Sequence, residues 1–398
     1  SMPLHDPARA FVPYPDAEVP HAGTGRLSGL CFAVKDLFDV AGYPTGGGNP
    51  FVLAMSGIKG GTAPTVQRLL DNGARFVGKT VTDELAFSMN GNNAHFGAPI
   101  NGAAPDRISG GSSSGSAAAV SNRLCDFALG SDTGGSVRAP ASHCGLYGIR
   151  PTHGAVSLAA TLDLAPSFDT CGWFTRDALT FARVSDVLLP ADSAAPLQRP
   201  RMLWPTDLWS QAVPGVREAL GPALDAAAAL WGAPHPTAAV LDDFDSMYWS
   251  FRFLQGREAW QVDGPLIERF APPLGPGVAE RFAWSRSVTD EQVLQAQVFR
   301  ERFRRHMAEC LGSDGVMVVP SMPDVAPRRS EPESALEDYR NRAIRILCVA
   351  GLAGLPQLSL PLGRKDGAPL GIGLIGPMGS DRSLVRMAEA MSAATRLS

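Results

Sequence analysis

Two serines and one lysine are the residues of this chain whose types and setting could support nucleophilic chemistry. Ser112 and Ser136 lie 24 residues apart, and each follows a Gly-Gly pair. Lys35 stands upstream in an apolar stretch, Phe32-Ala33-Val34-Lys35-Asp36-Leu37-Phe38. A serine hydroxyl becomes a nucleophile when a neighbouring base accepts its proton, and glycine-rich backbone can bring N–H groups close to a developing oxyanion. This combination is typical of attack on an acyl carbonyl.

One segment resembles a phosphate-binding loop. Gly73–Thr80 matches the pattern GxxxxGK[ST], but such a loop requires a strand before it and a helix after it. Here a helix is predicted over 62–72, with proline in its first turn and glycine after its end. Phe76 and Val77, inside the pattern, favour burial. The segment therefore predicts a helix, a turn and a short strand over 74–77, and not a nucleotide site.

A second segment resembles the nucleophile elbow of α/β-hydrolases. Gly111–Gly115 matches GxSxG with Ser113 at its centre, but an elbow follows a strongly apolar strand. Asp106–Ser109 is a poor strand, so a Ser-His-Asp hydrolase with Ser113 as nucleophile is disfavoured. Cys171 as a thiol nucleophile is disfavoured as well, because Ser136 is available.

None of the seven histidines belongs to a second catalytic motif. His95 and His143 lie near motif segments and could line a pocket, although packed or surface positions are favoured for both. The spacing of His143, Cys144 and His153 matches no zinc pattern. No metal site is expected.

Composition excludes several classes of protein. The chain has 398 residues, of which 45% are hydrophobic and 19% charged, so a large core is expected. The net charge of −4 offers no basic surface for nucleic acid. The six cysteines form no CxxC pair, which favours free thiols in a reducing compartment. No apolar run reaches the length of a membrane span, and a cytoplasmic protein with no membrane partner is expected.

The order of predicted elements favours an α/β fold. Strands are predicted within 30–40 and over 125–130, 315–320, 358–361 and 371–375, and an Ala-rich helix over 113–123. Strands that alternate with helices indicate a sheet covered on both faces. Residues 190–310 carry more charge and helical spacing, which predicts a helical insertion. The expected fold is a mixed, mostly parallel central sheet covered by helices on both faces, in a single large domain.

The two Gly/Ser segments together resemble a known family. Gly110–Gly115 and Asp132–Pro140, with their 24-residue serine spacing and the upstream Lys35, are similar to the signature of the amidase signature family. The resemblance covers about residues 28–185 and 315–395. Met89–Gly97 and Leu274–Arg281 are similar to plant indole-acetamide-type amidases. Ser114 departs from the pattern, since many members carry glycine there, but the signature tolerates a small residue.

The resemblance implies a Ser-cisSer-Lys mechanism. Ser136 would be the nucleophile that forms an acyl-enzyme, Ser112 would follow a cis peptide and relay the proton, and Lys35 would be the final base. A lysine acts as a base only when it is neutral, and apolar burial lowers its pKa. Four backbone N–H groups would form the oxyanion hole: Thr133, Gly134, Gly135 and Ser136. Four further residues would support the site: Ser113 and Ser131 by hydrogen bonds to the triad, Asp132 and Arg138 by pairing with each other.

The expected function is hydrolysis of a carboxamide to a carboxylate and ammonia, with no metal or organic cofactor. The expected organisation is a single amidase domain over residues 1–398, in which residues 190–310 form a variable helical cap. An aromatic cluster (Tyr248, Trp249, Phe251, Phe253 and Trp260) is interpreted as core packing or as one wall of an acyl pocket, which would suit aryl or indolyl acetamides. Two alternatives stay open: a catalytically silent binding domain, and the component of an amidotransferase that supplies its ammonia. The expected partners are a small-molecule amide and, if the chain self-associates, a second copy in a homodimer.

Overall fold

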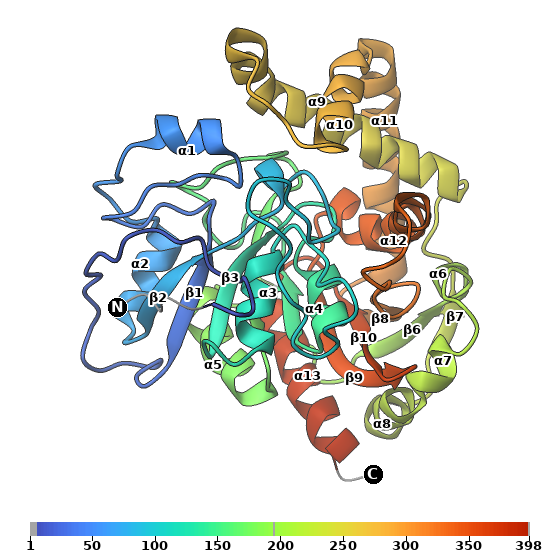
Figure 1. Ribbon diagram of the computed structural model, residues 1–398. Coiled ribbons are helices and arrows are strands. Elements are labelled where there is room, and N and C mark those ends of the chain that lie inside the picture. The colour runs from blue at the N-terminus through green and yellow to red at the C-terminus, as the bar shows by residue number, and fades with distance from the viewer. Residues whose placement is uncertain (1–5, 194–195, 397–398) are drawn as a thin grey trace.

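The computed structural model describes residues 6–193 and 196–396, and its centre is one ten-stranded sheet (Figure 1). The strand order across the sheet is β2-β1-β3-β5-β4-β9-β10-β8-β6-β7. The strands are β1 Cys31–Lys35, β2 Arg75–Thr80, β3 Phe127–Asp132, β4 Tyr147–Arg150, β5 Thr170–Thr175, β6 Arg201–Pro205, β7 His235–Thr237, β8 Gly315–Pro320, β9 Gln357–Lys365 and β10 Ala368–Ile375.

The sheet is mixed, as predicted, but the prediction that it is mostly parallel was wrong. β1 pairs in parallel with β2 and β3, and β6 pairs in parallel with β7 and β8, whereas the other five neighbouring pairs are antiparallel. One cause is the hairpin between β9 and β10. Its two-residue turn, Asp366-Gly367, has φ angles of 53° and 73°. Two positive φ angles are the geometry of a tight turn between antiparallel strands.

Helices cover the sheet on both faces. α3 and α4 contact each other and the strands β3, β9 and β10, while α5, α8 and α13 form a second group that contacts β5 and β9. In Figure 1 the first group stands in front of the sheet and the second lies below and behind it. The helices are α1 Pro50–Ser56, α2 Pro64–Asp71, α3 Ser114–Ser121, α4 Arg138–Cys144, α5 Ala178–Leu188, α6 Thr206–Trp209, α7 Val216–Ala219, α8 Gly221–Trp231, α9 Phe244–Phe270, α10 Val278–Ser287, α11 Asp290–Leu311, α12 Glu333–Ala353 and α13 Asp381–Arg396, with a 3-10 turn over Glu84–Ala86.

The segment that resembles a phosphate-binding loop is a helix, a turn and a strand, as predicted. α2 ends at Asp71, Gly73 turns the chain with a φ of 94°, and β2 follows. Lys79 of this segment is buried and lies 2.8 Å from the carboxylate of Asp36. A buried ammonium that is already paired with a carboxylate has no role in binding phosphate.

The predicted helical insertion over 190–310 is not purely helical. Its first part supplies β6 and β7, which extend the sheet at one edge. Its second part is the helices α9, α10 and α11. α9 contacts both α10 and α11, and the three stand together at the top of Figure 1. The helical spacing of the sequence therefore describes 244–311 well. The strands before it are short, and β7 has only three residues, which gives a weak sequence signal.

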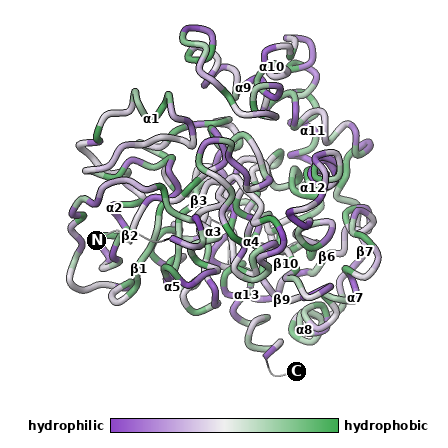
Figure 2. The backbone as a smooth tube through the Cα atoms, in the orientation of Figure 1, coloured by the Kyte–Doolittle hydropathy of each residue, from purple (hydrophilic) through white to green (hydrophobic). Residues whose placement is uncertain are grey.

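The apolar core follows the strands. Every residue of β3, β5, β8 and β10 is buried. Figure 2 shows apolar backbone (green) along strands such as β1, while polar stretches (purple) are frequent in α10 and α11. Residues buried on both faces of a sheet read as continuous apolar runs, and this is why 125–130 and 315–320 could be recognised as strands.

Candidate active site

Lys35 is the last residue of β1, and its amine is surrounded by serine hydroxyls. Nζ of Lys35 lies 2.6 Å from Oγ of Ser112, 2.9 Å from Oγ of Ser113 and 2.8 Å from Oγ of Ser131. The lysine, Ser112 and Ser113 are fully buried, and the peptide bond between Gly111 and Ser112 is cis. The structure thus brings four residues singled out in the sequence into one cluster.

Burial lowers the pKa of Lys35 from 10.5 to about 7, although the charges of Asp83, Asp132 and Asp169 oppose this shift. The cause is desolvation, because an ammonium in an apolar interior loses the hydration that stabilises its charge. A large share of the lysine is therefore neutral near pH 7. A neutral amine has a lone pair that accepts a proton, which the charged form lacks.

The Ser113 hydroxyl is held in place by the backbone of Ser131 in β3. Its Oγ lies 3.2 Å from the backbone N–H of Ser131, which donates to it, and 3.1 Å from the carbonyl of Ser131, which accepts from it. With Lys35 as a third partner, this hydroxyl has all its hydrogen-bonding positions in use. It is fully buried, so the geometry disfavours the nucleophile-elbow interpretation of the GxSxG match.

Ser136 lies in the loop between β3 and α4, and it borders a cavity. Its side chain is 4% exposed, and no described residue forms a hydrogen bond with its Oγ. Its carbonyl accepts a hydrogen bond of 3.3 Å from the N–H of Ser113, which ties the loop to the serine cluster. Of the four serines 112, 113, 131 and 136, only the last lines the cavity. A hydroxyl that is free of partners and open to a cavity can reach a bound substrate.

The loop before Ser136 needs glycine at two positions. A Cβ on Gly134 would lie 2.7 Å from the ring of Phe251, and Gly135 has a φ of 138° with Leu347 2.5 Å from the place of a Cβ. Among residues 6–193 and 196–396, no acceptor is bound to the backbone N–H of Gly134, Gly135 or Ser136. Unpaired N–H groups beside a cavity suit a developing oxyanion.

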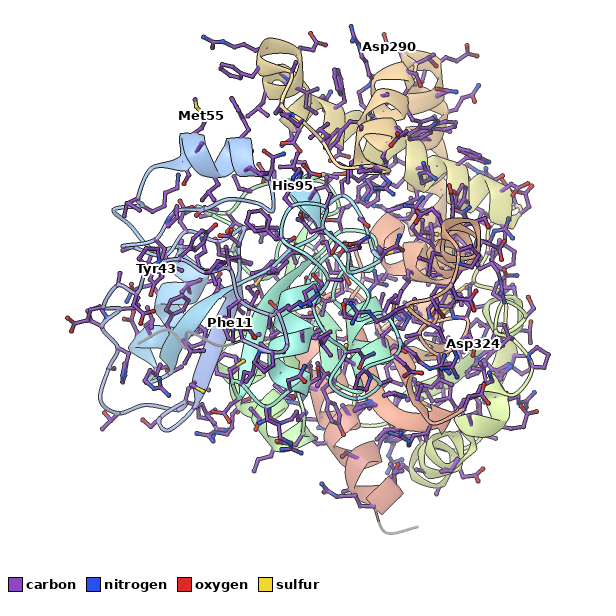
Figure 3. All side chains as sticks on the ribbon, viewed as in Figure 1. Phe11, Tyr43, Met55, His95, Asp290 and Asp324 are labelled. Carbon is purple, nitrogen blue, oxygen red and sulfur yellow. The ribbon has the colours of Figure 1, made fainter. Side chains whose placement is uncertain are left out.

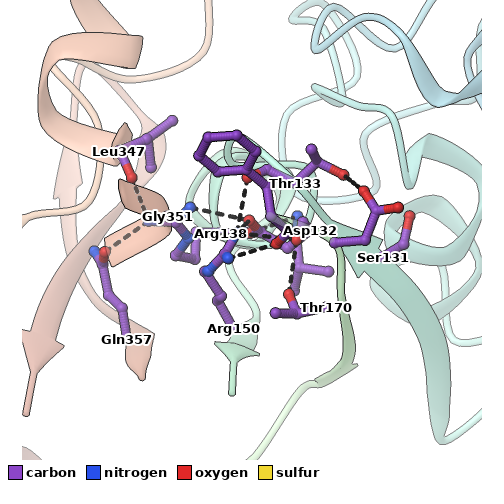
Figure 4. A network of polar contacts seen from close by, with 12 residues as sticks. Ser131, Asp132, Thr133, Arg138, Arg150, Thr170, Leu347, Gly351 and Gln357 are labelled. Atoms are coloured by element: carbon purple, nitrogen blue, oxygen red, sulfur yellow. Dashed lines mark hydrogen bonds and ion pairs between the residues drawn. The ribbon is translucent and has the colours of Figure 1, made fainter. Parts of the chain in front are cut away.

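A buried ionic network supports this loop from below (Figure 4). The guanidinium of Arg138 binds both carboxylate oxygens of Asp132, at 3.0 Å and 2.9 Å. Arg150 donates to the carbonyls of Asp132 and Thr133 at 3.0 Å and 2.8 Å. Burial alone would raise the pKa of Asp132, but the charges and hydrogen bonds of the two arginines hold it well below its usual range. The pair predicted between Asp132 and Arg138 is therefore in contact. Arg150 was not predicted, although a charge at the end of the apolar run Leu146–Ile149 was a visible signal.

The cavity at Ser136 is small and partly open to solvent, with a volume of about 40 Å³, and it has an apolar part and a charged part. The apolar part includes Phe87, Met89, Phe251 and Ile344. The charged part consists of arginines from the α9, α10 and α12 helices. Substrate pockets commonly combine apolar walls with a few polar groups that fix orientation.

The aromatic cluster of α9 contributes one residue to this cavity. Phe251 is buried and lines it, whereas Trp249 is 42% exposed and packs instead against Phe253 and Trp284. Of the two interpretations of the cluster, a wall of this cavity applies to Phe251 alone, and the other members do not line it. Trp249 and Phe251 are two positions apart on a helix, which turns by about 100° per residue, and so they point to nearly opposite sides.

His95, His143 and Cys171 do not line the cavity. His95, labelled in Figure 3, binds the buried carboxylate of Glu84 at 2.9 Å. His143 contacts the hydroxyl of Tyr339 at 2.8 Å, and burial lowers its pKa to about 3, so it is neutral. Burial raises the pKa of Cys171 far above its usual range, which leaves no thiolate. All six cysteines are free thiols.

Asp83 is a site neighbour that sequence reasoning missed. Its N–H donates to the carbonyl of Ser112 at 3.0 Å, its carboxylate accepts from the N–H of Gly91 at 3.0 Å, and burial raises its pKa to about 6. The N–H of Gly111 donates to the carbonyl of Met89 at 2.8 Å. The segment Met89–Gly97 thus supports the cis peptide, which the resemblance alone did not explain.

Within the described part of the chain, no three His, Cys, Asp or Glu side chains gather as metal ligands do. In the same residues, no helix combines the length and apolarity that a bilayer crossing requires.

Comparison with known proteins identifies the family of this chain. Residues 8–220 and 258–385 match the Amidase family. The chain is 37% identical to Amidase 1 of Arabidopsis thaliana over 92% of its length and 93% of the relative's. It is 33% identical to the chloroplastic outer envelope protein 64 of the same plant, over 98% of its own length and 69% of the relative's.

The fold has a close counterpart among solved structures. A crystal structure of an amidase superimposes on this chain with a TM-score of 0.81 and 27% identity, over 93% of this chain and 85% of that one. The family match extends over most of the chain, and the Gly/Ser segments that suggested it form one buried cluster. This chain therefore belongs to the amidase signature family, and it is an amidase.

Proposed function

We propose that this amidase hydrolyses a carboxamide to a carboxylate and ammonia through an acyl-enzyme on Ser136. The observation that carries the proposal is the buried amine of Lys35, which lies 2.6 Å from Oγ of Ser112 while Ser136 borders the cavity. Neutral Lys35 accepts a proton from Ser112, and Ser112 takes one from Ser136 as the Ser136 oxygen bonds to the carbonyl carbon. This transfer requires the Ser136 hydroxyl to turn toward Ser112 when the substrate binds.

The remaining steps return this proton. The oxyanion is bound by the N–H groups of the loop Thr133–Ser136. When the C–N bond breaks, the proton held on Lys35 passes back through Ser112 to the leaving nitrogen, which departs as ammonia. Water then attacks the acyl-enzyme by the same route, and it releases the carboxylate and restores the Ser136 hydroxyl.

The acyl group is proposed to contact Phe251, which lies over Gly134 of the oxyanion loop. This apolar wall suits the aryl or indolyl acetamides implied by the resemblance. The helices α9–α11 supply Phe251 and act as the cap over the site. A cytoplasmic location and a homodimer remain predictions. The outer envelope is named only in the description of a relative, and it is not a location assigned to this chain.

The proposal is tested by ammonia release from the purified chain alone. We expect acetamide and phenylacetamide to yield ammonia and the corresponding carboxylate in equal amounts, without any other protein. Release that required an added partner protein would favour the amidotransferase alternative. No release under either condition would favour a silent binding domain.

A second prediction concerns the wall residue. Phe251→Leu should lower kcat/KM for phenylacetamide about tenfold more than for acetamide, because one shape-specific contact in a hydrophobic pocket discriminates substrates by that order. Trp249→Ala is the matched control on the same helix, and it should change both substrates equally. Equal losses for both substrates in Phe251→Leu would show that the residue only packs the core.

A further inference from the structure

Three arginines converge on the Ser136 cavity from three different helices. Arg252 comes from α9, Arg281 from α10 and Arg340 from α12, and all three line the cavity, which has no acidic residue in its lining. α9 contacts both α10 and α12, and the three helices lie close together in Figure 1. The charges are therefore gathered by packing and not by sequence proximity.

None of the three guanidinium groups has a carboxylate within hydrogen-bonding distance among the described residues. The nearest is Glu337, whose oxygen lies 3.8 Å from Arg340 and whose side chain is 61% exposed. Arg281 donates to the carbonyl of Phe87. Arg252 donates to the hydroxyl of Tyr248 at 2.6 Å and stacks on neighbouring rings.

Of the three arginines, Arg340 has the most hydrogen-bond donors without a partner. Its Nε is buried and has no hydrogen-bond partner, and its side chain is only 11% exposed. Burial, followed by the charges of Arg340 and Arg252, lowers the pKa of Arg281 to about 9, while Asp83 and Glu337 act in the opposite direction. Like charges held together with unpaired donors are costly unless an anion joins them.

Two other buried arginines, Arg138 and Arg300, show the contrast. Arg138 binds a carboxylate and two further acceptors, and Arg300 donates to Ser167, Gly351 and Leu352. These groups are satisfied within the protein. The arginines of the cavity have fewer partners, and all three line the space beside Ser136. They also line a neighbouring cavity that contains the glutamates Glu84, Glu280, Glu333 and Glu337, none of which lies within hydrogen-bonding distance of them.

We infer that the substrate of this amidase carries a carboxylate, which the cluster of Arg252, Arg281 and Arg340 binds while the amide carbonyl lies at Ser136. The inference rests on the proposed function. Because ammonia is the leaving group, the carboxylate belongs to the acyl side, so the preferred substrate class is the monoamides of dicarboxylic acids, with an apolar spacer along Phe87 and Phe251, in place of the neutral aryl or indolyl acetamides that the resemblance implies. The planar fork of a guanidinium matches a carboxylate through paired hydrogen bonds.

The test compares anionic and neutral amides of the same shape. Malonamate, succinamate and glutaramate are paired with 3-methylbutanamide, 4-methylpentanamide and 5-methylhexanamide, in which two methyl groups replace the carboxylate oxygens. For at least one pair we expect the wild-type kcat/KM to be tenfold or more higher for the anion, and free succinate to compete with it. Arg340→Gln should lower kcat/KM for that anion at least tenfold, mainly through KM, and change the neutral partner less than threefold.

Arg286→Gln is the control, because Arg286 lies on α10 but is exposed and lines none of the cavity. Arg340→Lys should restore part of the preference, since it keeps the charge without the fork. Wild-type preference for the neutral amides, or an equal loss for both classes in Arg340→Gln, would overturn the inference and leave the proposed function intact. Failure to hydrolyse any amide would instead contradict the proposed function itself.

Discussion

Lys35→Ala is expected to lower kcat/KM for amide hydrolysis by about 10²–10⁴-fold, the range that general base catalysis contributes. The amine of Lys35 is the only nitrogen base that the structure places against Ser112 in the described residues. Without it, the proton of Ser136 has no acceptor beyond the serine relay. Steady-state kinetics with the preferred amide measures the effect, with circular dichroism as the control for folding.

The role of Lys35 also predicts how kcat/KM changes with pH. Burial lowers the pKa of Lys35 to about 7, and the neutral form is the active one. Below that pH the neutral fraction falls about tenfold per unit, so kcat/KM should fall on the acidic side and level off towards alkaline pH. Asp83, with a pKa of about 6, titrates nearby. The pH dependence of the residual activity of Lys35→Ala distinguishes Lys35 from Asp83, because this variant should lack the fall of kcat/KM at acidic pH that protonation of the lysine causes.

Lys79→Ala is the matched control for this prediction. Lys79 is also a buried lysine, on the neighbouring strand β2, but it pairs with Asp36. Breaking a buried ion pair is expected to cost about 3–5 kcal/mol of unfolding free energy, so the melting temperature of Lys79→Ala should fall. The decrease of its kcat/KM at acidic pH should remain as in the wild type. Near-wild-type activity in folded Lys35→Ala would contradict the role of Lys35.

Ser136→Ala should have the larger effect, with a loss of kcat on the order of 10⁶-fold, as when the nucleophile of a serine hydrolase is removed. The Oγ of Ser136 is the atom that forms the bond to the acyl carbon, and no neighbouring hydroxyl of the cluster lines the cavity. Ser112→Ala should be less damaging, because a water molecule can partly replace a relay but not a nucleophile. Kinetics of the two variants side by side measures the difference.

The controls for Ser136→Ala are the thermal stability of the variant and its affinity for the carboxylate product. The hydroxyl makes no hydrogen bond with any described residue, so its loss should leave the melting temperature and the affinity for the carboxylate product close to those of the wild type. Equal activities of Ser136→Ala and Ser112→Ala would contradict the distinction between nucleophile and relay.

The sequence predicted the centre of the site because the chemistry there is local. Apolar neighbours on both sides of Lys35 indicated its burial, and the two Gly-Gly-Ser segments indicated tight backbone beside hydroxyls. Their convergence follows from β1 lying next to β3 in the sheet. The helix before Gly73 likewise excluded a phosphate loop on local grounds.

What escaped prediction depends on distant packing. The three arginines of the cavity are spread over 89 positions, from 252 to 340, and each one alone is an ordinary helix residue. The separation of Phe251 from Trp249 required knowledge of which face of α9 meets the oxyanion loop. The antiparallel centre of the sheet is a different case, because Asp366-Gly367 between two apolar runs is itself a local hairpin signal.

The central claim is that the acyl group is transferred to Ser136, and the most direct measurement is to locate a covalent adduct. The wild-type enzyme is treated with a fluorophosphonate, digested and mapped by peptide mass. We predict one phosphonyl group on the peptide that contains Ser136, and none in Ser136→Ala. An adduct on Ser113 or Cys171 in the wild type, or continued labelling of Ser136→Ala, would contradict the account.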